Sequence, residues 1–143
     1  MPESKISPQA ALIYTMVLAA AADREMTDGE LRAIEEMIVF LPAFHDFEIA
    51  SIAAIAAGCT DLLAKDNGLD IAFRRIKSAL PPGRLRETAY ALACDVVAAD
   101  GVVSQEELEF LELLRNAVDV DRLAAAAIER AARARFSPIE SAH

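Results

Sequence analysis

The sequence predicts an all-α protein of about seven helices in a single domain that spans residues 1–143. The chain is rich in alanine and leucine and contains no tryptophan, a composition that favours closely packed helices over strands. No segment shows the alternation of apolar and polar residues that is typical of a half-buried strand. Prolines stand at the boundaries of apolar stretches with helical spacing, at Pro8, Pro42 and Pro81-Pro82, where they start or stop helices. A chain of this length can bury a core without a disulfide.

The chain should begin with two helices. Ser7 and Pro8 have the order of an N-cap and a first helical residue, so a helix should run from there to about Asp23. Thr27 should cap the second helix, with Glu30 at the third helical position to complete a capping box. The apolar face of this second helix is predicted to comprise Leu31, Ile34, Met37, Ile38 and Leu41.

Two further helices should follow before the strongest helix breaker in the chain. Asp46 is predicted to start the third helix, with apolar positions at Ile49, Ile52, Ala53 and Ala56. A fourth helix should begin near Asn67 or Asp70 and end at Leu80. The triplet Pro81-Pro82-Gly83 then excludes helix and divides the chain into two halves.

Three helices are predicted for the second half. The first should open near Arg84, and Ser104 with Glu107 should form a second capping box at the start of the next. That second helix is expected to bury Leu108, Leu111, Leu114 and Val118. The last helix should run from about Asp121 to Arg135, with inward positions at Leu123, Ala126, Ala127 and Ile128.

One motif occurs twice, at residues 21–31 and 98–108. Each copy has two small residues, an Asp, a hydroxyl residue four positions after the Asp, and Glu-Leu three positions after the hydroxyl. Asp23 and Asp100, like every other matched pair, are 77 positions apart (100 − 23). The match predicts an internal duplication in two pseudo-symmetric repeats, repeat one at about residues 8–41 and repeat two at about 84–118.

The second copy, Ala-Ala-Asp-Gly-x-x-Ser-x-x-Glu-Leu from Ala98 to Leu108, follows an Ala/Leu-rich helix and resembles the TerB family of tellurite-resistance proteins. The resemblance covers roughly Pro8 to Arg135. It implies a cytoplasmic, wholly helical domain in a family that is linked to tellurite and other stress responses and to metal binding through acidic residues. No enzymatic reaction is implied. Arg24 stands in the first copy where the motif has glycine, which sets that junction apart.

Acidic residues at the two motif copies form the candidate site. Asp100, Gly101 and Glu107 match the second half of an EF-hand calcium loop, but Val96 and Ala98 occupy the positions of the first ligands, which argues against a calcium site of that strength. A weaker divalent-cation site is predicted, because pseudo-symmetry would bring the carboxylates of both copies together. Its residues would be Asp23, Glu30, Asp100 and Glu107, supported by Glu25, Asp28, Ser104 and Glu106.

A second interpretation gives the motif a purely structural role. Asp would end one helix, the hydroxyl would cap the next, and Glu would return the capping hydrogen bond, each cap contributing about 1 kcal/mol. The working surface would then be an apolar or charged groove between helices that binds a protein partner or forms a homodimer. In either interpretation, the acidic segment from Asp23 to Glu48 could dock a basic partner or be an ordinary solvated surface.

Other functional classes find little support in the sequence. Cys59 and Cys94 form no Cys-x-x-Cys pair and are expected to be buried thiols, and His45, beside Asp46, has no recognisable nucleophile near it, so no catalytic residue is assigned. The net charge is −9, made of −8 in residues 1–70 (4 bases, 12 acids) and −1 in residues 71–143 (10 bases, 11 acids), which argues against nucleic acid as a ligand. No apolar stretch reaches the roughly 20 residues of a membrane span.

Overall fold

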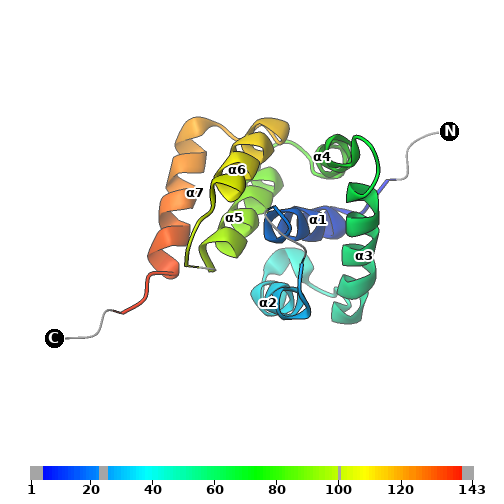
Figure 1. The fold of residues 1–143 in the computed structure, drawn as a ribbon, viewed down its shortest axis with the longest axis horizontal. Coiled ribbons are helices and arrows are strands. Elements are labelled where there is room, and N and C mark those ends of the chain that lie inside the picture. The colour runs from blue at the N-terminus through cyan, green and yellow to red at the C-terminus, as the bar shows by residue number, and fades with distance from the viewer. Residues whose placement is uncertain (1–4, 23–25, 100, 140–143) are drawn as a thin grey trace.

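The computed structural model describes residues 5–22, 26–99 and 101–139, and over these residues the chain contains helices and loops but no strand (Figure 1). The α-helices of this part are α1 (Pro8–Ala20), α2 (Asp28–Ile38), α3 (Ile52–Leu63), α4 (Gly68–Ala79), α5 (Arg84–Ala99), α6 (Gln105–Ala117) and α7 (Arg122–Arg135). Two short 3-10 helices, η1 (Pro42–Phe44) and η2 (Ile49–Ser51), lie between α2 and α3. The all-α prediction is confirmed, and none of the helices described is long and apolar enough to cross a bilayer.

Helix α1 is the centre of the fold (Figure 1). Every residue from Ala10 to Ala20 is buried, so the burial predicted for one face extends around the whole helix, as expected for a helix without a polar side. Its one buried polar side chain, Thr15, donates its hydroxyl to the Ala11 carbonyl at 2.8 Å. The Ser7 hydroxyl caps the helix as predicted, accepting from the Ala10 amide at 3.0 Å. Helix α1 packs most extensively on α5 and also contacts α2, α3, α4 and α6.

The connection from α2 to α3 differs from the prediction. Asp46 does not start a helix, because its backbone has a φ of +61° in the left-handed region, which a helix cannot continue. The chain instead turns through η1 and η2 around Phe44, which is buried and meets Phe47 edge to face at 5.3 Å between ring centroids. Helix α3 therefore begins only at Ile52. Its buried side is formed by Ile52, Ala56, Cys59 and Leu62.

Helix α4 begins at a position that only glycine can occupy. A Cβ atom on Gly68 would lie 2.1 Å from the carbonyl oxygen of Leu62, so the close approach of α4 to the end of α3 requires the missing side chain. Asn67, immediately before it, takes the left-handed conformation with a φ of +59°. The start predicted near Asn67 is thus confirmed, and its cause is a tight turn between two packed helices.

The second half is joined to the first by Arg86, at the start of α5. Its guanidinium donates to the carbonyls of Leu80 (3.0 Å) and Lys77 (3.1 Å), both at the end of α4. It also lies 3.6 Å from the Asp119 carboxylate in the loop between α6 and α7, and Lys77 pairs with the same carboxylate at 3.0 Å. Arg86 thus donates hydrogen bonds to the last carbonyls of α4, which have no partner within the helix. The two basic side chains beside Asp119 also lower the pKa of its carboxyl group, mainly through the hydrogen bond from Lys77.

The inward faces predicted for the last two helices are partly wrong. Leu108 is 53 % exposed and Leu123 is 83 % exposed. Helix α6 buries Phe110 beside the predicted Leu111 and Leu114. Helix α7 has its main contacts with α5 alone, so its buried stripe is narrow and is formed by Ala125 and Ala132. Of the positions predicted to point inward on α7, Ala126 and Ala127 are exposed and Ile128 is half-buried.

The junction between the halves provides the first test. We expect Arg86→Met to lower the free energy of unfolding by about 1–3 kcal/mol, because the substitution keeps an apolar stem but removes charged donors from two carbonyls. The matched control is Arg84→Met, on the same turn but exposed, which should change stability by less than about 0.5 kcal/mol. Urea denaturation followed by circular dichroism measures both. Equal effects of the two substitutions would contradict the role assigned to Arg86.

Candidate functional site

Both predicted capping boxes are present at the repeated motif. At the start of α2, the Thr27 hydroxyl accepts from the Glu30 amide at 3.1 Å, and the Thr27 amide donates to the Glu30 carboxylate at 2.8 Å. At the start of α6, the Ser104 hydroxyl accepts from the Glu107 amide at 3.1 Å, and the Ser104 amide donates to the Glu107 carboxylate at 2.9 Å. In each glutamate one carboxylate oxygen is therefore engaged by its own helix terminus.

The remaining residues of the predicted cation site divide into two groups. Asp23, Glu25 and Asp100 lie outside the described residues. Of the described ones, Asp28 and Glu106 are exposed in the first turns of α2 and α6, whereas Glu107 is only 2 % exposed. Within the described residues, no three His, Cys, Asp or Glu side chains are grouped so as to hold a metal ion. The divalent-cation site stays a prediction, as does the pseudo-symmetric relation of the repeats.

The two junctions are nevertheless neighbours in space. A small cavity of about 40 Å³ joins Glu30 of α2 to Ala20 at the end of α1 and to Val96 and Ala99 at the end of α5. A larger pocket, of about 290 Å³, joins Ala21 and Ala22 after α1 to the first turns of α6. Each of the two hollows is thus lined by residues of both motif copies.

We call the larger of these hollows the acidic pocket. Its walls are apolar and come from four parts of the fold, namely Leu18, Ala21, Ala22, Leu63, Leu69, Phe110 and Leu113. Glu106 and Glu109, both exposed on α6, add two carboxylates to this lining. Glu109 accepts only a long hydrogen bond, 3.4 Å, from the Gln105 amide. Two carboxylates over apolar walls suit a cationic group carried on an aliphatic stem.

A further hollow, which sequence reasoning did not find, lies between α5, α6 and α7. We call it the α5–α7 groove. It has a volume of about 350 Å³ and is lined mainly by apolar residues, among them Val97, Ala98, Val103, Leu108, Leu111 and Phe136. The alanines at positions 98 and 132 leave the space open, since neither fills the gap between the helices. The exposure of Leu108 is explained by its place at this groove.

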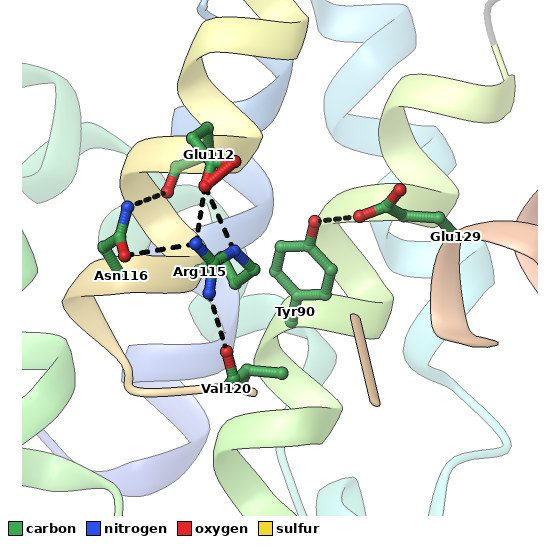
Figure 2. A network of polar contacts seen from close by, with 6 residues as sticks. All are labelled: Tyr90, Glu112, Arg115, Asn116, Val120 and Glu129. Carbon is green, nitrogen blue, oxygen red and sulfur yellow. Dashed lines mark hydrogen bonds and ion pairs between the residues drawn. The ribbon is translucent and has the colours of Figure 1, made fainter. Parts of the chain in front are cut away.

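The lining of the groove includes the Cys94 thiol and Glu129, whose carboxylate is bonded to a buried tyrosine. Tyr90 of α5 donates its hydroxyl to the Glu129 carboxylate of α7 at 2.6 Å (Figure 2). Burial, followed by that carboxylate, raises the pKa of Tyr90. Burial likewise raises the pKa of the Cys94 thiol to about 12. Cys59, in α3, is buried and free like Cys94, as the sequence predicted.

The position of α7 beside the groove is fixed by two polar contacts. Arg115 near the end of α6 donates to the Val120 carbonyl in the loop before α7 at 3.2 Å, and Glu112 and Asn116 hold its guanidinium at 2.6 and 3.2 Å (Figure 2). At the other end of α7, Arg135 pairs with Asp95 of α5. The groove is therefore a preformed space rather than a gap between loose helices.

His45 lines neither the acidic pocket nor the α5–α7 groove. It is exposed in the turn after η1, with its imidazole 3.3 Å from the carboxylate of the neighbouring Asp46.

Comparison with known proteins gives one match. Residues 9–131 match the family model of the tellurite resistance protein TerB, which covers most of the chain. No significant match was found among curated proteins or among solved structures.

The capping box at α6 can be tested by its stability contribution. We expect Ser104→Ala to lower the free energy of unfolding by about 1 kcal/mol, because the Glu107 amide loses its acceptor. Ser51→Ala is the matched control, since the Ser51 side chain makes no capping hydrogen bond at α3. Thermal and urea denaturation measure both variants. A Ser104→Ala variant as stable as the parent would show that the box is not needed for folding.

The buried thiols predict a loss of stability in alkali. Cys59 and Cys94 have folded-state pKa values raised from 9.0 to about 12, so their contribution is complete below pH 9 and is lost as the pH rises above that value. The free energy of unfolding should therefore fall between about pH 9 and pH 12. A Cys59→Ala/Cys94→Ala variant should lose less over the same interval, with the remainder due to Tyr90. Urea titrations at several pH values give the two slopes, and equal slopes would contradict the assignment.

Proposed function

The chain belongs to the TerB family of tellurite resistance proteins, and from that membership we propose that it is a cytoplasmic binding module of a tellurite or stress response. Its ligand, in this proposal, is a basic segment of a protein partner that binds at the acidic pocket. The observation that carries the proposal is the pairing of Glu106 and Glu109 with apolar walls at the place where the two motif copies meet.

Binding rather than catalysis is supported by the state of the reactive groups. The raised pKa of Cys59 and Cys94 keeps both thiols protonated at neutral pH, and the thiolate is the form needed for nucleophilic or redox chemistry. His45 is exposed and paired with Asp46 in a surface turn. Neither kind of group lines the acidic pocket, so we propose no chemical step there.

The walls of the acidic pocket favour a basic side chain over a bare metal ion. A divalent cation such as Ca²⁺ takes six to eight oxygen ligands, whereas this pocket offers two glutamates among leucine, alanine and phenylalanine side chains. A lysine or arginine places methylenes on apolar surface while its charged end reaches carboxylates. The net charge of −9 would also attract a basic partner over a distance.

A divalent cation is the second candidate, for a specific reason. Glu30 and Glu106 come from different repeats, and each lines a hollow to which both motif copies contribute residues. The predicted ligands Asp23 and Asp100 belong to the same two junctions. A cation held between the junctions would therefore draw on both copies of the motif, as the sequence suggested.

An amide-resolved NMR titration with a hexalysine peptide tests the proposal. We expect saturable shifts confined to residues 18–22, 63–69 and 106–113, and a Glu106→Gln/Glu109→Gln variant should bind about two- to thirtyfold more weakly, at roughly 0.2–1 kcal/mol for each of the two exposed pairs. The charge-matched control is Glu36→Gln/Asp61→Asn, on exposed positions of α2 and α3.

Three outcomes decide between the candidates. Weakening by the pocket variant alone supports the basic partner. Equal weakening by both variants would mean a diffuse electrostatic attraction and would contradict a site at the pocket. In a separate titration, Mn²⁺ broadening centred on residues 26–30 and 101–107, with no peptide binding, would favour the divalent cation.

A further inference from the structure

The α5–α7 groove has the dimensions and the chemistry of a site for a small amphiphilic molecule. Its volume of about 350 Å³ falls within the roughly 300–1,000 Å³ of ligand pockets in proteins. Apolar side chains from all three helices line it, and Leu108 and Phe136 are exposed at its opening while Leu111 is buried. An apolar space that stays open to solvent on one side accommodates a hydrocarbon body with a polar end.

The charges beside the groove select the sign of that polar end. Glu129 accepts the Tyr90 hydroxyl, and Asp95 is paired with Arg135. Arg133 lines the groove, is exposed, and has no ion-pair partner in the described part of the chain. The exposed Arg133 guanidinium, which lines an apolar space and makes no direct ion pair with a described residue, can bind a single anionic group.

The same wall limits the ligand to one negative charge. Glu129 stands four residues before Arg133 on α7, and both line the groove. A second negative charge on the ligand would therefore lie against this carboxylate and be repelled. Arg130, which is exposed on α7 but does not line the groove, contributes no contact.

We propose that the α5–α7 groove binds a small aliphatic monocarboxylate, with its hydrocarbon chain between α5, α6 and α7 and its carboxylate on Arg133. The site is separate from the acidic pocket and does not depend on the function proposed for it. Lengthening the chain should strengthen binding by about fourfold for each buried methylene until the groove is filled. The carboxylate should add selectivity over a neutral or cationic head group of the same length.

The experiment is an amide-resolved NMR titration of the full chain with octanoate, octanol and octylammonium. We expect saturable shifts at residues 94–98, 103–111 and 129–137, with octanoate bound at least fivefold more tightly than octanol and octylammonium bound most weakly. Hexanoate and decanoate extend the series. Arg133→Gln should reduce octanoate to the affinity of octanol and leave octanol unchanged, whereas Arg130→Gln should change neither.

A pair of surface substitutions tests the apolar part without disturbing the core. Leu108→Asn, at the opening of the groove, should weaken octanoate and octanol alike, and Leu123→Asn, on the exposed first turn of α7, should weaken neither.

The proposal is overturned if no saturable shift occurs below the micellar concentration of octanoate, or if Arg133→Gln leaves the preference for octanoate over octanol intact. Binding of an acidic amphipathic peptide at these residues without binding of octanoate would also overturn it, and would make the groove a protein-docking surface.

Discussion

The burial of α1 on all its sides is the constraint on which the rest of the structure depends. A helix without a polar face is stable in water only when other elements surround it, and here five of the other six helices described contact it. Of its polar side chains, Thr15 is bonded to its own backbone and Gln9, in the first turn, donates to the Ala43 carbonyl, so α1 holds its neighbours almost entirely by apolar contact. Beyond its first turn, α1 therefore exposes no polar side chain. Exposed polar residues follow only after its C-terminal end, where the first copy of the motif begins.

The acidic pocket and the α5–α7 groove follow from the same packing. Alanines allow α1 and α5 to approach each other closely, because little side chain stands between the two backbones. Where the alanines continue past the contact, at Ala21 and Ala22 after α1 and at Ala98 in α5, the side chains are too short to reach the next helix. The acidic pocket and the α5–α7 groove are formed at these places. Small residues thus serve the core and also create the two candidate binding sites.

The features that the sequence predicted well are local, whereas the features that it missed depend on contacts between distant segments of the chain. The caps at Ser7, Thr27 and Ser104 each depend on residues within three positions, and all three are present. The turn at Asp46 depends instead on where Phe44 is buried, and the exposed side of α7 depends on how few helices cover it. The groove could not be predicted because its walls come from three helices. The acidic pocket was predicted in part: Glu106 was named, but not Glu109 or the apolar walls.

Helix α6 connects the two candidate sites, since its sides face different hollows. Glu106, Glu109 and Leu113 line the acidic pocket, whereas Leu108 and Leu111 line the groove. A helix free to rotate would enlarge one hollow at the expense of the other. Helix α6 is held against such rotation by its buried side chains Phe110, Leu111 and Leu114 and by Arg115, which joins its last turn to the loop before α7 (Figure 2). Because α6 is fixed in this way, each hollow keeps its shape without a ligand, and an occupant of either needs no ordering of the helix that the two sites share.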